Sequence, residues 1–193
     1  MTSFLLIAFG YLLGSIPTGV IVARMASDVD LKNVGSGSTG ATNVTRAFGV
    51  KFGVITMVGD CLKGLLPTLI ARNFSNSPLV ITCVAFAALL GHIYPVYVGF
   101  RGGKGVATSL GVLLGISPVV ALLAFFVWGS TSKITGSITV GALSAALALP
   151  MLMAGIASEM VYFILSIVIF CLILFTHRDN IRRIIKGQGF PSN

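Results

Sequence analysis

The chain has 193 residues, of which 55% are hydrophobic and 9% charged, with a net charge of +8 and a mean hydropathy of +1.00. A soluble domain has roughly a quarter of its residues charged, so this composition excludes an ordinary soluble protein. Four long runs, at 73–100, 105–132, 134–158 and 160–176, contain no Asp, Glu, Lys or Arg. Because each run is continuously apolar, helices that cross a membrane are favoured over alternating strands. We therefore predict an all-α polytopic membrane protein.

The first membrane span is predicted at about 4–25. No basic residue precedes it and Arg24 stands near its end, which is the reverse of a cleaved signal peptide. The next spans are predicted at about 53–71 and 79–98. Ten of the thirteen basic residues gather at 24–51, at 101–104 and in the tail after 176. The positive-inside rule places these groups on the cytoplasmic side and the N-terminus outside. Attraction to anionic lipids is the alternative explanation for some of the charges.

Residues 105–132 decide the number of spans. The segments 134–154 and 158–176 supply two crossings, and the basic tail must end on the cytoplasmic side. One span over 105–132 would put the tail outside, whereas two short helices broken at 115–118 restore the pattern. Pro118 favours such a break because it disfavours helix at the preceding residue. We expect a single domain over 1–193 with seven transmembrane helices, short fourth and fifth spans and a cytoplasmic C-terminus.

Ionisable residues are rare inside the predicted spans. Asp60 and Lys63 stand one helical turn apart in the second span and are expected to pair, either for function or for structure alone. His92, near the inner end of the third span, is expected to hydrogen-bond a neighbouring helix. The five acidic residues are dispersed, and the three cysteines are scattered in apolar segments. They predict no metal site, and no cofactor is expected.

The first polar loop, residues 28–53, is rich in Gly, Ser, Thr and Asn. It contains G-x-G-x-x-G, but a membrane span precedes it rather than a strand, so a dinucleotide site is not predicted. Glycines let the backbone approach a ligand closely, and an arginine can pair bidentately with phosphate. A plain polar loop is the alternative. The phosphate-binding candidates are Gly35, Ser36, Gly37, Ser38, Gly40, Thr42, Asn43 and Arg46.

The second motif is "GFRGGKG", residues 99–105. It is not a Walker A loop, because Val98 stands where that pattern needs Gly and Gly105 where it needs Ser or Thr. Consecutive glycines can form a nest of N–H groups for an anion, and the following helix offers its N-terminus. Lys104 supplies a point charge. The alternative is a flexible basic turn at the membrane surface.

The third motif is "THRDNIRRIIKGQG", residues 176–189. His177 and Asn180 would share one face of a continuing helix. Anchoring of a basic helix at the lipid surface is the alternative. Together, two glycine-rich anion cradles, cations, hydroxyls, one His and one Asn suit the binding of phosphates beside a lipid tail.

Two other classes of protein are compatible with part of this pattern. A transporter for phosphorylated anions should place charges near the bilayer midplane and often contains inverted repeats. No internal repeat is visible, and the predicted anion-binding residues lie on one side of the membrane. A purely structural membrane subunit would not explain three polar motifs on that side. An enzyme is therefore favoured.

The stretches "GSGSTGATNVTRAFG", "GHIYPVYVGFRGGKGVATSLG" and "HRDNIRRI" resemble the three motifs of the bacterial acyl-phosphate-dependent glycerol-3-phosphate acyltransferases. The resemblance covers essentially the whole chain. It implies transfer of an acyl chain from acyl phosphate to the sn-1 hydroxyl of glycerol 3-phosphate, giving lysophosphatidic acid and phosphate in the first step of phospholipid biosynthesis. It also implies the bacterial inner membrane, with the motifs facing the cytoplasm. A soluble enzyme that makes acyl phosphate would be a partner, and no nucleic acid is expected.

The resemblance also implies roles for individual residues. Catalytic roles fall on Ser36, Arg46, Lys104, His177 and Asn180, and binding of acyl phosphate on Gly99, Arg101, Gly102, Gly103 and Gly105. The chain departs from the family at Ser38, where relatives have Asn, and at Gln188, near which relatives have Glu. In "KITGSITV" a family serine is replaced, so either Ser137 or Thr139 would supply a hydroxyl. The proton of the glycerol hydroxyl would pass to His177 or to a substrate phosphate.

Overall fold

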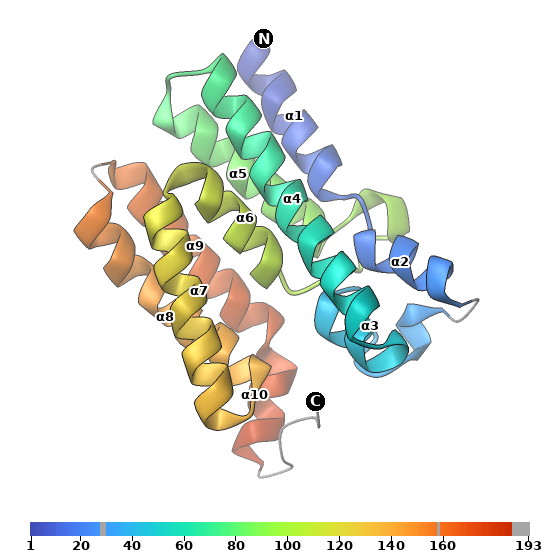
Figure 1. Ribbon diagram of the computed structural model, residues 1–193. Coiled ribbons are helices and arrows are strands. Elements are labelled where there is room, and N and C mark those ends of the chain that lie inside the picture. The colour runs from blue at the N-terminus through green and yellow to red at the C-terminus, as the bar shows by residue number, and fades with distance from the viewer. Residues whose placement is uncertain (28–29, 158, 187–193) are drawn as a thin grey trace. The chain divides into compact units, whose positions relative to one another are not determined.

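The computed structural model describes residues 1–27, 30–157 and 159–186, and over these residues the chain is helical without any strand (Figure 1). It divides into two compact units, Met1–Gly115 and Ile116–Asn193, each with its own packed interior. The all-α prediction is thus confirmed for the described residues.

The first unit is built around one long helix, α4. Its helices are α1 (Thr2–Gly14), α2 (Thr18–Ala26), α3 (Ala41–Phe48), α4 (Val50–Phe74), α5 (Pro78–Ile93) and α6 (Val106–Ile116), with 3-10 turns η1 (Leu31–Asn33) and η2 (Val96–Val98). Helix α1 packs along α5 and α4, and α2 and α3 also pack on α4 (Figure 1). The predicted first span is divided by a break at 15–17, where Pro17 precedes α2.

Glycines allow these helices to touch backbone to backbone. A Cβ atom at Gly14 of α1 would lie 2.1 Å from the carbonyl oxygen of Ala88 in α5. A Cβ atom at Gly111 of α6 would lie 1.9 Å from the carbonyl oxygen of Cys61 in α4. Since lipid tails are as apolar as the side chains, helix association in a membrane depends on this kind of close packing.

Helix α6 has 11 residues and is too short to cross a bilayer by itself. The last carbonyl groups of any helix have no partner within the helix. Here Nη1 of Arg72, at the end of α4, donates to the carbonyl oxygen of Gly115 at 2.6 Å. A carbonyl group at the end of α6 therefore gains its hydrogen-bond partner from an arginine of the neighbouring helix.

The second unit consists of α7 (Pro118–Thr135), α8 (Ile138–Ile156), α9 (Met160–Thr176) and α10 (Arg178–Ile185). Helices α7 and α8 form a hairpin through Gly136, which has φ of 64°. Helix α9 packs against α8, and α10 leaves α9 at an angle of 59°. The buried residues of this second unit include Val120, Ala124, Ala142, Leu149, Met153, Leu165 and Ile169.

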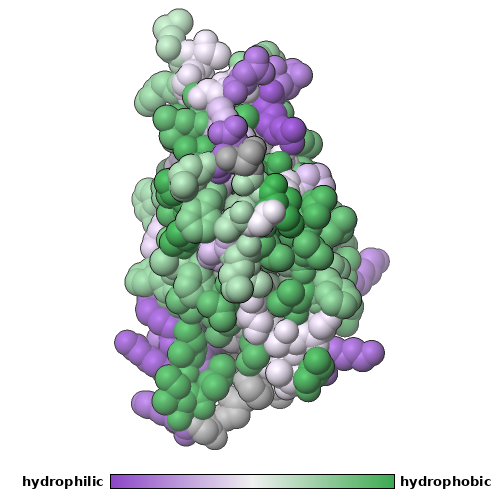
Figure 2. Space-filling model, turned by 90° about the vertical axis from the view of Figure 1, so that its left-hand side faces the viewer, coloured by the Kyte–Doolittle hydropathy of each residue, from purple (hydrophilic) through white to green (hydrophobic). Residues whose placement is uncertain are grey.

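Large apolar side chains lie exposed along these helices, and Figure 2 shows them over most of the face that it presents. In the described residues, five segments are long and apolar enough to cross a membrane: Thr2–Ala26, Val50–Phe74, Pro78–Val98, Pro118–Thr135 and Ile138–Ile156. The bent pair of α9 and α10 is a possible sixth. The chain is thus an all-helical membrane protein with five to six candidate spans.

The break predicted at 115–118 is present, because α6 ends at Ile116 and α7 begins at Pro118 with Ser117 as its N-cap. Helix α6 is short, as expected of the fourth segment. Helix α7 has 18 residues and passes as a full span, so the prediction of a short fifth span is wrong. Pro118 suits the first helical position, where its missing N–H is not needed, and the helix is not shortened by it.

We predict that Gly14→Ala destabilises the protein by about 1–3 kcal/mol, because the added methyl group overpacks the contact of α1 with α5. The measurement is the midpoint of thermal unfolding in detergent. Gly129→Ala on α7 is the matched control, since no atom lies within 4 Å of its added Cβ. A midpoint for Gly14→Ala equal to that of the control would contradict the close packing.

Candidate active site

The first glycine-rich loop is shaped by one buried side chain, Asn43 of α3. Its Oδ1 accepts the N–H of Ser36 at 2.9 Å, and its Nδ2 donates to the carbonyl oxygens of Val34 at 3.0 Å and Ser38 at 2.9 Å. Gly35 and Gly37 have φ of 58° and 66°, a conformation that favours glycine. The amide of Asn43 thus takes part in the loop's own structure, and the side chain of Ser36 is left exposed.

Helix α3 is held by a small apolar cluster. The cluster consists of Val22, Ala23, Leu31 and Val44, with Ala47, Phe48 and Phe52 packed against it. On α3, Thr42 and Arg46 are half-buried. A Cβ atom at Gly53 would lie 1.8 Å from Oγ1 of Thr45, so α3 lies directly on the first turn of α4. The loop and Arg46 are therefore carried by a packed element.

The second glycine-rich loop folds back on the end of α5. The N–H of Gly102 donates to the carbonyl oxygen of Ile93 at 3.1 Å, and that of Gly103 to the carbonyl oxygen of His92 at 3.2 Å. A Cβ atom at Gly103 would lie 2.2 Å from Nε2 of His92. The predicted nest of N–H groups is wrong at these two positions. Gly102 and Gly103 serve close packing instead of presenting their amides to an anion.

The ends of this loop carry its conformational strain and its charge. Gly99, Phe100 and Gly105 have φ of 73°, 59° and 88°, which is the left-handed region. Arg101 is exposed, and Lys104, two residues before the start of α6, is half-buried. The first N–H groups of a helix lack partners within it, so anion binding at the start of α6 stays a prediction.

In the second unit, His177 lies at the junction of α9 and α10 and is 4% exposed. Its Nδ1 lies 2.9 Å from the carbonyl oxygen of Ile173. A carbonyl oxygen can only accept, so Nδ1 carries the proton, and in the neutral ring Nε2 is the basic nitrogen. A helix-end carbonyl thus sets the tautomer of this histidine.

Asn180 follows on α10, but the chain bends by 59° at His177, so the continuing helix predicted through both residues is not present. Nδ2 of Asn180 donates to Oγ1 of Thr139 at 3.3 Å. Ser137 is buried and caps α8, because its Oγ accepts the N–H of Val140 at 3.4 Å. Of the two hydroxyls left open by the sequence, the structure brings Thr139 to Asn180 and uses Ser137 as a helix cap.

Comparison with known proteins places this geometry in a family. The family model described as glycerol-3-phosphate acyltransferase matches residues 4–187. A glycerol-3-phosphate acyltransferase of Geotalea daltonii is 45% identical over 188 residues, covering 97% of this chain and 96% of that protein. The enzyme of Aquifex aeolicus is 44% identical over 191 residues, covering 97% of this chain and 98% of that protein. The chain belongs to the glycerol-3-phosphate acyltransferase family.

Two solved structures are similar to this acyltransferase over nearly its whole length. Both are of PlsY (YgiH), described as an integral membrane glycerol 3-phosphate acyltransferase. The glycerol 3-phosphate form is 42% identical with a TM-score of 0.93, covering 97% of this chain and 94% of that one. The lysophosphatidic acid form is 41% identical with a TM-score of 0.91 and the same coverage. The chain is therefore an integral, multi-pass membrane enzyme.

Within this acyltransferase, the candidate residues fall in two groups. The first and second motifs, with Ser36, Arg46 and Lys104, belong to the unit Met1–Gly115. His177 and Asn180 belong to the unit Ile116–Asn193, together with Thr139. Gln188 lies outside the described residues. In the part of the chain that the structure describes, His, Cys, Asp and Glu side chains nowhere gather in a group of three that could hold a metal ion.

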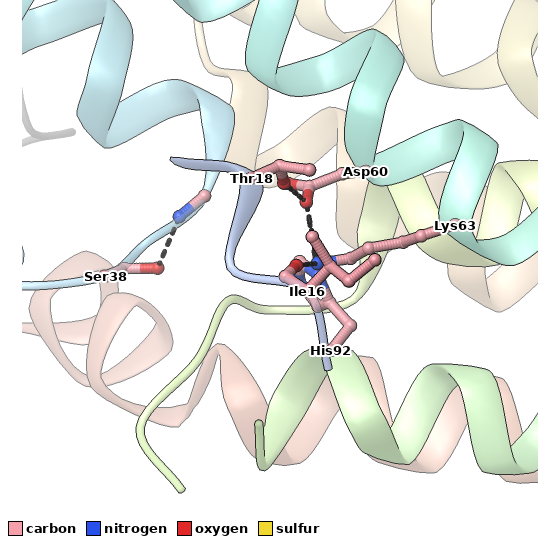
Figure 3. Close-up of polar contacts among 7 residues, drawn as sticks. Ile16, Thr18, Ser38, Asp60, Lys63 and His92 are labelled. Carbon is pink, nitrogen blue, oxygen red and sulfur yellow. Dashed lines mark hydrogen bonds and ion pairs between the residues drawn. The ribbon is translucent and has the colours of Figure 1, made fainter. Parts of the chain in front are cut away.

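One polar residue of the first unit was missed by the sequence analysis. Thr18 donates its hydroxyl to Oδ1 of Asp60 (Figure 3). The predicted Asp60–Lys63 pair is confirmed, with 2.9 Å between Nζ and Oδ1. Pro17 was the available signal for Thr18, because a proline inside an apolar run indicates a break that can turn a polar side chain inward.

We predict that Asn43→Ala loosens the first glycine-rich loop, because it removes several hydrogen bonds that are each worth about 1 kcal/mol. Amide hydrogen exchange at residues 34–38 should rise about ten-fold or more. Asn33→Ala, at an exposed asparagine in η1, is the control. Unchanged exchange in Asn43→Ala would show that the loop does not depend on this side chain.

Proposed function

We propose that this enzyme uses acyl phosphate as its donor, and acylates the sn-1 hydroxyl of glycerol 3-phosphate to give lysophosphatidic acid and phosphate. The observation that carries the proposal is the pair of glycine-rich loops in one unit, each accompanied by a cation, Arg46 or Lys104. The similar solved structures are described with glycerol 3-phosphate and with lysophosphatidic acid, which supports this acceptor and this product. The reaction would be the first step of phospholipid synthesis.

The chemistry asks for positioning more than for strong acid–base catalysis. The acceptor's hydroxyl oxygen forms a bond to the carbonyl carbon, and the bond from that carbon to the phosphate oxygen breaks. The proton of the hydroxyl leaves with the phosphate in the end, so the reaction balances without a cofactor. Two anionic substrates must be held side by side, which makes orientation and charge stabilisation the main catalytic contributions.

We assign the residues accordingly. Ser36, Arg46 and Lys104 bind phosphate oxygens, since a guanidinium and an ammonium both form charge-assisted hydrogen bonds with them. Asn43, Gly102 and Gly103 shape the loops through their own hydrogen bonds. The residues that line the phosphate sites are Gly35, Gly37, Ser38, Gly40, Thr42, Gly99, Arg101 and Gly105. Either Nε2 of His177 or a phosphate oxygen takes the proton first. Asn180 and Thr139 orient a substrate by hydrogen bonds, with Ser137 holding the start of α8.

The proposed enzyme acts as a single domain over 1–193 in the bacterial inner membrane. Seven crossings require that α6, too short to span lipid by itself, completes a crossing while packed against α4, in addition to the six candidate spans. An N-terminus outside and cytoplasmic loops follow from the distribution of basic residues. Glycerol 3-phosphate would then arrive from the cytoplasm, and a soluble enzyme would supply the acyl phosphate.

We predict that purified protein in lipid, without added metal, makes lysophosphatidic acid from palmitoyl phosphate and labelled glycerol 3-phosphate. Acyl-CoA and acyl carrier protein should give no product. Arg46→Ala and Lys104→Ala should each lower kcat/KM about ten- to hundred-fold, because each loses a charge-assisted hydrogen bond. Lys51→Ala, an exposed cation on α4, is the control. Product from a thioester alone would overturn the proposed donor.

We also predict that Thr139 and Asn180 act as a pair. Thr139→Val should lower kcat/KM about ten-fold in the wild-type background and change it little in Asn180→Ala, because the hydroxyl and the amide share one hydrogen bond. Thr131→Val on α7 is the matched control. Additive losses in the double variant would contradict the pairing.

A further inference from the structure

A buried polar cluster lies where α2, α4 and α5 meet (Figure 3). Oδ1 of Asp60 lies 2.9 Å from Nζ of Lys63 and 3.5 Å from Nδ1 of His92, and it accepts the hydroxyl of Thr18. Nζ of Lys63 also donates to the carbonyl oxygen of Ile16 at 2.9 Å. Asp60, Lys63 and His92 are 2%, 6% and 4% exposed. Three segments distant in sequence thus meet at one carboxylate.

Stability alone is a poor explanation for this cluster. Removing charges from water has a free-energy cost that a well-made ion pair barely recovers, and apolar residues of similar size are often as stable. Ionisable side chains within membrane-spanning helices usually mark a functional site. The location of the cluster indicates what that role is.

The cluster reaches the second glycine-rich loop through His92. The imidazole faces Asp60 with Nδ1, and on its other side Nε2 lies so close to Gly103 that no Cβ atom fits there. The carbonyl oxygen of the same residue accepts the N–H of Gly103 at 3.2 Å. The ring and the carbonyl group of His92 therefore both support the backbone directly before Lys104.

The cluster reaches the first glycine-rich loop through Thr18. The next residue, Gly19, packs on that loop, since a Cβ atom there would lie 1.9 Å from the carbonyl oxygen of Thr39. Thr39 is buried and stands between Ser38 and Gly40. The hydrogen bond from Thr18 to Asp60 fixes the start of α2, and α2 in turn supports the loop before Arg46.

We propose that Asp60 is a positioning residue that holds both glycine-rich loops at a fixed distance from one another. One carboxylate accepts the hydroxyl of Thr18, which supports the first loop, and lies 3.5 Å from Nδ1 of His92, which supports the second, while Lys63 compensates its charge. The inference rests on the proposed function in one respect, that the two loops bind the phosphates of the two substrates. Asp60 itself contacts no substrate in this role.

The test compares Asp60→Asn, Thr18→Val and Thr18→Ser with Thr68→Val. Thr68 is a matched control, because it lies on the same helix, is buried, and donates its hydroxyl to the carbonyl oxygen of Gly64 in that helix. Amide exchange should rise about ten-fold in both loops, residues 35–40 and 102–105, for Asp60→Asn. It should rise in residues 35–40 alone for Thr18→Val, and in neither loop for Thr18→Ser or Thr68→Val.

Kinetics provide a second readout that a merely structural residue would not change. Loss of folded enzyme lowers the rate but leaves KM alone, whereas a displaced loop raises KM. We expect Thr18→Val to raise KM for one substrate about ten-fold, and Asp60→Asn to raise KM for both. If Asp60→Asn does not fold, Thr18→Val decides for the first loop, because it leaves every charge in place. His92→Gln, which keeps the pair of Asp60 and Lys63, then decides for the second loop through exchange at residues 102–105.

The outcomes separate this inference from the proposed function. A wild-type enzyme that makes no lysophosphatidic acid from acyl phosphate would end the proposed function, and the exchange experiment would still decide whether Asp60 holds the loops. Folded Thr18→Val with wild-type exchange at residues 35–40 and wild-type KM for both substrates would overturn the positioning role.

Discussion

The constraint behind this structure is that lipid offers no hydrogen-bond partner to an interrupted backbone. Every break in a helix must find its partners within the chain. The break before α2 presents the carbonyl oxygen of Ile16 to Lys63. The loop after α5 donates from Gly102 and Gly103 back to that helix, and the end of α6 receives Arg72. Each interruption is thus paired with a polar group supplied by a neighbouring segment, and the candidate site is assembled from these interruptions.

Much of the fold could be predicted from the sequence, because long apolar runs indicate helices and the prolines, glycines and charged residues between them indicate where helices end. The break at Pro118 and the pairing of Asp60 with Lys63 both depend on residues close together in the chain. The sequence analysis predicted α7 to be shorter than it is, because no residue near its start indicates how far the helix continues. A proline at the first position of a helix marks where it starts and carries no information about where it ends.

The candidate site was predictable in its residue types and less so in its geometry. Glycines in a row are compatible with an anion nest or with close packing, and only the position of His92 decides for Gly102 and Gly103. The amide of Asn43 could have faced a ligand, and it instead bonds the loop around Ser36. Such choices depend on partners that are near in space and distant in sequence, which a single chain's pattern does not reveal.

Because α6 is short, the second glycine-rich loop before it lies some way along α4 and not at the end of that helix. Gly64 of α4 lies against Thr108, in the first turn of α6, so α6 begins beside the middle of α4. Asp60 is ten residues beyond Val50, where α4 starts. At about 1.5 Å per residue this is about 15 Å along the helix axis. His92 lies beside Asp60 at this depth and packs on Gly103, so the residue before Lys104 is anchored about three turns into α4 and not at its first turn. For the acyl phosphate proposed as donor, the phosphate adjoins the acyl carbon, so binding beside Lys104 keeps the hydrocarbon chain close to the apolar helices, and the water-soluble acceptor is the substrate that has to travel.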